Sequence, residues 1–353
     1  KGTGKVASQV LWQEQSGFQL VDVNADIAGS EISGDVSFVP ETQELSGDIL
    51  LLSPDLSAFA EIIGMPLSGA ADLKANGQAD IAAKSYQIDA EFSGNNVQVG
   101  IAELDTLIAG AMTGSLKAGL DGTSVSIETL ELNAPLLSIS AKNNGTPDFL
   151  TYSASLKDVA PIAPGFSGPF SLNGTAQLND ADTQRVQVDA TANGPAGLTM
   201  RASGDVIELG NTLDLALSGA APMGLVNSFI APNSVQGTLR YELDVNGAPQ
   251  LSSVSGRLSI SDGRIALPDS GIVLGRVDGA ITLTGSSAQV DIRGVSNAGG
   301  SLNVSGPVSL ATGNNADLTI ALRDFGVTEP DLFETSLSGQ VQVNGPLTQY
   351  ARI

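Results

Sequence analysis

Apolar and polar residues alternate with a period of two through most of this chain, which is the periodicity of a half-buried β-strand. Acidic residues obey the alternation, because Asp22, Asp189, Asp214, Asp244 and Asp291 each stand between two apolar neighbours. Each alternating segment therefore predicts a strand with one apolar and one polar face. The segments are 21–27, 124–132, 185–190, 213–217, 238–245, 257–260, 280–284, 289–293, 301–304, 317–322 and 340–343.

Residue pairs that favour tight turns recur along the chain. Asn-Gly occurs at 76, 144, 173, 193, 246 and 344, and Asp-Gly occurs at 121, 262 and 278. Both pairs tolerate the positive φ of hairpin turns, so we expect them to join neighbouring strands. The pattern predicts an elongated, mostly antiparallel all-β fold with about 20–30 strands.

Helix signals are few and short. The segment 54–63 has Ser53 or Asp55 as a possible cap and ends before Gly64, and the segment 223–230 lies between Pro222 and Pro232. A single helical turn is also expected at 331–335. These signals predict one to three short helices.

A short phrase recurs with irregular spacing, each time followed by Asn-Gly. We expect the whole chain, 1–353, to be one continuous β fragment of a longer protein, with its softest boundary near 143–168. The phrase starts near 67, 166, 235 and 337, and its glycines Gly69, Gly168, Gly237 and Gly339 are 99, 69 and 102 residues apart.

Composition excludes several classes of function. The chain has no Cys and no His, so it has no thiol nucleophile, no imidazole base and no thiolate or imidazole metal site. We therefore expect no enzyme, no metal and no cofactor. The net charge of −22 argues against nucleic acid and against an anionic lipid surface. No apolar run is long enough for a membrane-spanning helix.

An apolar sheet face must be covered. The few helices and the 4 % aromatic content offer little to fill an interior. Two interpretations stay open: an ordinary β-core that fills itself, or a long apolar groove that is accessible to a ligand.

Several phrases resemble one known family. The stretch Ser255–Asp269 (SGRLSISDGRIALPD) resembles the "SGxLxIxDGRIxLPD" phrase of the TamB family, the AsmA-like translocation and assembly module proteins of Gram-negative bacteria. The segments 272–284, 299–306 (GGSLNVSG) and 337–346 (LSGQVQVNGP) are similar to family phrases in the same order. Upstream, 54–57 followed by 64–73 resembles earlier repeats. The resemblance is closest over 235–350.

The resemblance implies a periplasmic location, with an inner-membrane anchor before this segment. It also implies a C-terminal domain after it, which meets an outer-membrane barrel of the BamA type, usually TamA. The family fold is a long β-sheet curled into a taco-like groove with a hydrophobic interior. Family roles are phospholipid transfer between the two membranes and outer-membrane protein assembly. We expect a monomer.

The first hypothesis is therefore a lipid conduit, in which phospholipid acyl chains lie on the apolar face and headgroups stay in water. The candidate lining residues are Val186, Val188, Leu213, Leu215, Leu239, Tyr241, Leu243, Val245, Leu258, Ile260, Ile265, Leu267, Ile281, Leu283, Val290, Ile292, Leu302, Val304, Leu318, Ile320, Val341 and Val343.

Two alternatives stay open. One is a scaffold or chaperone for outer-membrane proteins, which would add a client strand to an open sheet edge by backbone pairing. The other is a surface adhesin built as a β-solenoid, to which the high content of Gly, Ser, Asn and Ala is suited. The irregular spacing and the 16 prolines argue against it.

Overall fold

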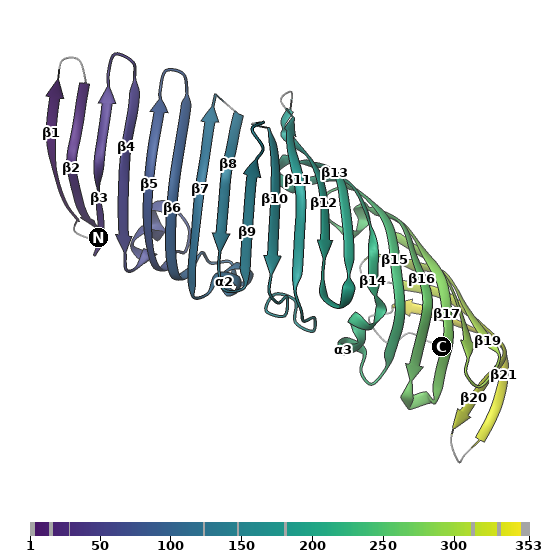
Figure 1. Cartoon of the computed structure of the whole chain (residues 1–353). Coiled ribbons are helices and arrows are strands. Elements are labelled where there is room, and N and C mark those ends of the chain that lie inside the picture. Colours follow the sequence, from purple (N-terminus) through teal and green to yellow (C-terminus); the bar gives the residue numbers. More distant parts are fainter. Residues whose placement is uncertain are drawn as a thin grey trace. The chain divides into compact units, whose positions relative to one another are not determined.

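The chain forms an antiparallel β-sheet of 21 strands (Figure 1). The computed structural model describes residues 4–13, 17–27, 29–122, 124–146, 148–179, 182–311, 315–329 and 333–346. The predicted all-β, antiparallel class is thus confirmed. Contacts divide the chain into two compact units: unit 1 holds 1–164 and 169–183, and unit 2 holds 165–168 and 184–353.

Unit 1 is an antiparallel meander in which each strand pairs with the next in sequence. Its strands are β1 (Gly4–Gln13), β2 (Gly17–Ile27), β3 (Ser30–Val39), β4 (Glu44–Ser53), β5 (Ser68–Asp80), β6 (Ser85–Gln98), β7 (Ala111–Asp121), β8 (Ser124–Asn133), β9 (Leu137–Asn143), β10 (Phe149–Leu156) and β11 (Phe170–Asn179).

Unit 2 has the same meander order. Its strands are β12 (Asp182–Asn193), β13 (Thr199–Ile207), β14 (Thr212–Pro222), β15 (Ser234–Gly247), β16 (Val254–Leu267), β17 (Ile272–Thr284), β18 (Ser287–Ser296), β19 (Ser301–Ser309), β20 (Asn315–Glu329) and β21 (Phe333–Pro346). Every alternating segment named from the sequence lies in a strand.

Both longer helix predictions are confirmed. The segment 54–63 contains the 3-10 turn η1 (Leu56–Phe59) and α1 (Ala60–Ile63), and the Asp55 carboxylate accepts the backbone N–H of Ser57 at 2.9 Å. The segment 223–230 contains η4 (Met223–Val226) and α3 (Asn227–Ile230). The other 3-10 turns are η2 (Pro195–Gly197), η3 (Glu208–Gly210), η5 (Leu251–Ser253) and η6 (Pro268–Ser270).

The third predicted helix, at 331–335, is wrong over the part that the structure describes, 333–335. Residues 331 and 332 lie outside the described residues, but 333–335 open β21 and pair with β20. A further helix, α2 (Ala102–Ile108), has no signal among the predicted helices and is the longest helix described. Its N-cap position is Ile101, which cannot cap with a side chain. Instead, Asp105 accepts the backbone N–H groups of Val99 at 2.7 Å and Gly100 at 3.2 Å.

The turn predictions need correction. Asp121-Gly122 and Asn144-Gly145 lie at strand connections as expected, and Asn193-Gly194 spans the end of β12. Most of the other pairs lie inside strands, where glycine allows close contact with a neighbouring strand rather than a chain reversal. A Cβ on Gly279 would lie 2.5 Å from the backbone oxygen of Asp291. The pairs inside strands begin at 76, 173, 262, 278 and 344, and the pair at 246 ends β15.

The recurrent phrase marks a β-bulge in three of its four copies. The register shifts at Gly69 and at Gly237, and the facing residues Asn96 and Asp262 have φ of 50° and 54°. Near Gly339 the shift falls on β20, where Asp324 has φ of 47°. The backbone N–H of Asp324 donates to the Ser338 hydroxyl oxygen at 2.8 Å. The fourth copy lies before β11. The phrase thus marks places where a β-bulge increases the local twist of the sheet.

A glycine substitution tests the close packing of strands in unit 2. Gly204 has φ of +137°, and a Cβ there would lie 2.1 Å from the Asp214 backbone oxygen. We expect Gly204→Ala to lower the free energy of unfolding by about 2–3 kcal/mol. Gly224→Ala is the control, because its Cβ would meet no atom closer than 3.6 Å. Urea unfolding followed by circular dichroism measures both, and equal effects would contradict the packing account.

Candidate functional site: the apolar face

The candidate lining residues share one face of unit 2. Directly opposed residues of antiparallel strands lie on the same side of a sheet. One row runs across seven strands from β15 to β21, and a second row beside it runs from β15 to β18. The first row is Leu239, Ile260, Gly279, Ile292, Val304, Ile320 and Val341, and the second is Tyr241, Leu258, Ile281 and Val290.

The structure therefore brings the predicted residues together. All of them lie in described strands of unit 2, and all are half-buried except Val245, which is buried. The aspartates Asp189, Asp214, Asp244 and Asp291 are exposed, and their strand positions put them on the opposite, polar face. Asp22, in unit 1, is also exposed.

Part of the unit 2 face packs on itself. Leu274, Val277 and Phe325 form a buried cluster, and Val277 is only 1 % exposed. Ile260, Ile265, Ile292 and Leu302 of the predicted lining pack against that cluster. A second cluster of Ala288, Val308 and Ala316 takes in Ile281, Leu283, Val290 and Leu318. These contacts are those of a self-filled β-core, the more ordinary of the two interpretations.

The most open apolar face lies in unit 1, outside the predicted lining residues, which all belong to unit 2. Ile49, Tyr86, Ile88 and Val125 are 46 %, 42 %, 43 % and 52 % exposed. Phe18 and Leu45 are also exposed. A cross-strand row joins Phe18, Phe38, Leu45, Ala79, Tyr86, Leu120 and Val125.

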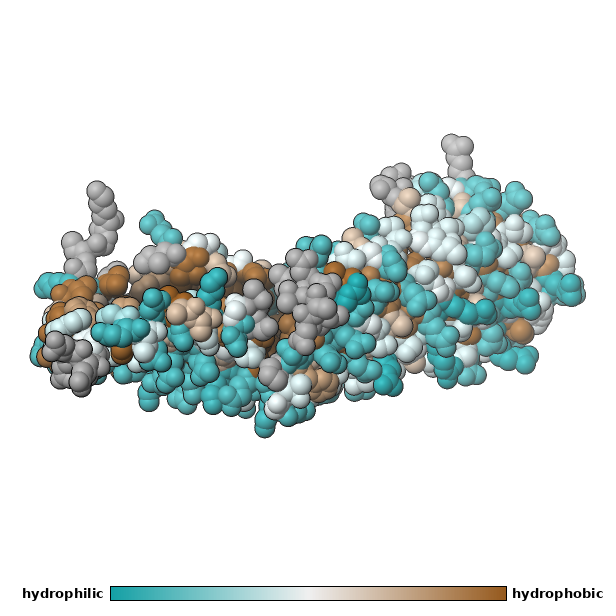
Figure 2. All heavy atoms as spheres, turned by 90° about the horizontal axis from the view of Figure 1, so that it is seen from above, coloured by the Kyte–Doolittle hydropathy of each residue, from teal (hydrophilic) through white to brown (hydrophobic). Residues whose placement is uncertain are grey.

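Figure 2 shows apolar residues gathered along one side of the sheet in the part that holds β1–β8, with polar residues on the other side. The available signal was the alternation of Leu45, Gly47, Ile49 and Leu51. That signal was weakened by Leu50 and Leu52 on the polar face.

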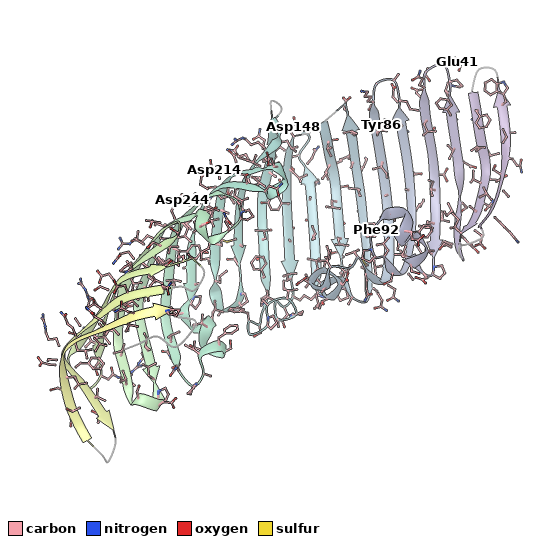
Figure 3. All side chains as sticks on the ribbon, turned by 180° about the vertical axis from the view of Figure 1, so that it is seen from behind. Glu41, Tyr86, Phe92, Asp148, Asp214 and Asp244 are labelled. Atoms are coloured by element: carbon pink, nitrogen blue, oxygen red, sulfur yellow. The ribbon has the colours of Figure 1, made fainter. Side chains whose placement is uncertain are left out.

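Helical connections cover the other end of this face. Val97, Leu107, Ile108, Met112 and Leu137 form a buried cluster in which α2 lies over the sheet. Figure 3 places Phe92 at this end, beside the helices, and Tyr86 toward the strand end that carries Glu41. The apolar face of unit 1 is therefore closed at one strand end and open at the other.

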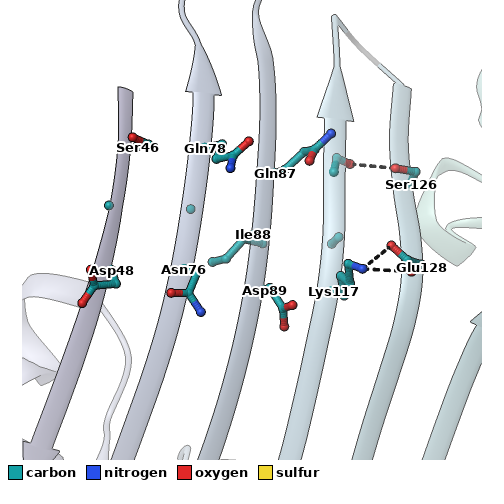
Figure 4. A pocket seen from close by; sticks show the side chains of 14 residues that line it. Ser46, Asp48, Asn76, Gln78, Gln87, Ile88, Asp89, Lys117, Ser126 and Glu128 are labelled. Atoms are coloured by element: carbon teal, nitrogen blue, oxygen red, sulfur yellow. Dashed lines mark hydrogen bonds and ion pairs between the residues drawn. The ribbon is translucent and has the colours of Figure 1, made fainter. Parts of the chain in front are cut away.

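The polar face of unit 1 has a shallow depression of about 550 Å³ across β4–β8 (Figure 4). Lys117 and Glu128 form an ion pair there at 3.0 Å, and this hydrogen bond raises the pKa of Lys117. Asp48 and Asp89 also line it. Its lining is mostly polar, with Ile88 as the one large apolar residue, so this depression is not the apolar groove that the sequence suggests.

Tyr241 gives the unit 2 face a measurable pH dependence. Its hydroxyl donates to the Thr199 backbone oxygen at 2.9 Å, and burial raises its pKa above the ordinary 10.0. A raised pKa favours the neutral phenol in the folded state, so this contribution is complete below pH 10 and is lost as the pH rises through the folded pKa.

We expect Tyr241→Phe to cost about 1 kcal/mol at pH 7 and to reduce the decline in stability above pH 10. Urea unfolding between pH 7 and pH 11 measures both effects. Tyr86→Phe is the control, because the exposed Tyr86 hydroxyl has no hydrogen-bond partner among the described residues. An alkaline decline that is unchanged in Tyr241→Phe would contradict this assignment.

Among the residues that the structure describes, no group of three or more acidic side chains is placed to hold a metal ion. Within the same described ranges, no helix is long and apolar enough to cross a membrane. Comparisons with protein-family models, with curated proteins and with solved structures find no match.

Proposed function

We propose that this chain binds phospholipid acyl chains on the apolar face of its sheet and holds them there without chemical change. The observation that carries the proposal is the open apolar surface of unit 1, where Ile49, Tyr86 and Ile88 stay exposed. Acyl chains bury such surface with a gain of about 25 cal/mol per Å². Contiguous apolar surfaces of this kind commonly mark an interaction site.

The charge distribution is compatible with this role. Residues 1–183 carry seven lysines and 23 acidic residues, a net charge of −16. An acidic protein keeps its polar face in water, so the apolar face is the side on which an acyl chain would lie. Phospholipid headgroups would remain at the rim, in solvent.

The resemblance to the TamB family supplies the cellular setting of the proposal. In that setting the chain lies in the periplasm, its sheet curls into a taco-like groove, and phospholipid passes between the inner and outer membranes. An outer-membrane barrel of the BamA type would be the partner, reached through a further C-terminal domain. This setting rests on the phrases at 255–269, 299–306 and 337–346.

A scaffold role is the second candidate. Among the described residues, β1 pairs only with β2 and β21 only with β20, so each has one edge on which a client strand could pair. Such pairing uses the backbone, so apolar-face substitutions would leave it intact.

Binding of a fluorescent long-chain fatty acid to the purified, delipidated chain tests the proposed function. We expect saturable binding that an unlabelled phospholipid displaces. The absence of saturable binding would leave the apolar face without a lipid role.

A further inference from the structure

A second site of different character lies on the polar face of unit 2. A depression of about 910 Å³ is lined by Arg276 on β17, Arg293 on β18 and Arg323 on β20. Asp278 is the one carboxylate that lines it. This cluster is unexpected in a chain with 16 basic and 38 acidic residues.

The strand register places the three arginines together. Arg276 faces Val295, which faces Ser301, which in turn faces Arg323. Arg276 and Arg323 therefore lie in one row on the polar face, three strands and about 14 Å apart. Arg293 lies in the adjacent row, opposite Asp278.

Few carboxylates of the chain neutralise the charge of these arginines. Neither Arg276 nor Arg323 forms an ion pair with any residue that the structure describes. Arg293 approaches Asp291 only at 3.8 Å and is 76 % exposed. The Asp278 carboxylate already accepts the backbone N–H of Asp262 at 3.3 Å. The positive charge of the depression is thus available to a ligand.

Two other depressions show that this charge balance is particular to the site. On the same face of unit 2, Arg201 and Arg257 share a depression with Glu242 and Asp244. In unit 1, Lys117 shares its depression with Asp48, Asp89 and Glu128. Only the depression around Arg276, among these three, has an excess of cations.

We propose that Arg276, Arg293 and Arg323 bind an oligoanion that carries two or more phosphate groups. A guanidinium presents a planar fork of donors, and tetrahedral phosphate oxygens accept from more than one such fork at once. The spacing assigns one phosphate to Arg276 and Arg293 and another to Arg323. Ser301, Asn303 and Gln340 line the same space and offer neutral polar contacts.

The site is independent of the proposed acyl-binding role, because it lies on the polar face of unit 2. Its ligand can come from two sources with the same chemistry: a free oligophosphate, or the phosphorylated headgroup of a lipid whose chains lie elsewhere.

Calorimetric titration of the full chain with inorganic tripolyphosphate at low ionic strength tests the site. We expect one class of binding site, and at least a tenfold loss of affinity in R276Q/R323Q. Because Arg276 and Arg323 are exposed, we expect this variant to fold normally. Circular dichroism checks its fold. R276K/R323K keeps the positive charge but loses the planar guanidinium fork. Its affinity should therefore lie between those of the wild type and R276Q/R323Q.

R201Q/R257Q is the matched control, because it removes the same two charges from the same face beside Glu242 and Asp244. It should change affinity less than twofold. Equal losses in R201Q/R257Q and R276Q/R323Q would mean only a general charge effect and would overturn the proposal. Unchanged affinity in R276Q/R323Q would also overturn it.

Vesicle flotation separates the two sources of phosphate. Vesicles of a zwitterionic lipid, with and without a lipid that carries a phosphate monoester headgroup, are incubated with the chain. Retention that requires both that headgroup and the arginines assigns the site to a lipid headgroup. Tripolyphosphate binding without retention assigns it to a free oligophosphate, and neither binding nor retention overturns the proposal.

Discussion

Replacing Ile88 with Asp is expected to weaken fatty-acid binding to the purified chain at least tenfold, which corresponds to about 1.4 kcal/mol. Ile88 is 43 % exposed on the open apolar face, in a row with Gly77 and Ala118. A carboxylate there must lose water when an acyl chain covers it, which is unfavourable. Because the side chain is already exposed, we expect little loss of folding stability. Fluorescence titration measures the affinity.

Gln87→Asp is the matched control for this variant. Gln87 is the preceding residue of β6, is exposed, and lies on the polar face beside Gln78. It introduces the same carboxylate one position away and on the other side of the sheet. We expect its affinity to stay within twofold of the wild type. Equal losses in both variants would show that negative charge alone, and not the apolar face, governs binding.

Replacing Val277 with Asp is expected to have the largest effect on stability. Val277 is 1 % exposed and lies at the centre of the cluster with Leu274 and Phe325. An isolated carboxylate cannot be buried there without losing its hydration, so we expect a loss of about 4 kcal/mol or more, or failure to fold. Urea unfolding measures the loss.

Thr282→Asp on the same strand is the control. Thr282 is exposed on the polar face of β17, opposite Arg257 and Gln289. Its substitution should change the free energy of unfolding by no more than about 0.5 kcal/mol. A mild effect of Val277→Asp would contradict the self-packed core of unit 2.

The fold class was predictable because period-two alternation reports strand faces directly. Segments such as 185–190 and 238–245 lie in strands with the predicted face inward. Turn pairs were less informative, because glycine serves two roles that look alike in sequence. Asp278-Gly279 has the sequence of a turn, yet Gly279 lies inside β17, where the missing side chain allows β18 to approach closely.

The extent of burial was not predictable from alternation. Predicted lining residues of unit 2, such as Ile260 and Ile292, pack against a buried cluster, whereas Ile49 and Ile88 of unit 1 remain exposed. The difference depends on which strands approach one another and on where α2 covers the sheet. Neither is encoded in a local pattern of apolar residues.

The net charge also concealed a local feature. A value of −22 argues against anionic partners on average, but all nine arginines lie between 185 and 352. Three of them converge only through the pairing of β17 to β20. Arg276 and Arg323 are 47 residues apart in the sequence, so no short sequence motif indicates that they lie together.

Site-specific photo-crosslinking in cells tests whether acyl chains lie on the apolar face of the sheet. Probes at Ile49 and Ile88 in unit 1, and at Leu243 and Leu283 in unit 2, are compared with probes at the polar-face neighbours Asp48, Gln87, Asp244 and Thr282. We expect phospholipid adducts at the apolar-face positions alone, strongest at Ile49 and Ile88. Adducts to proteins, or equal labelling on both faces, would contradict an apolar face that carries acyl chains.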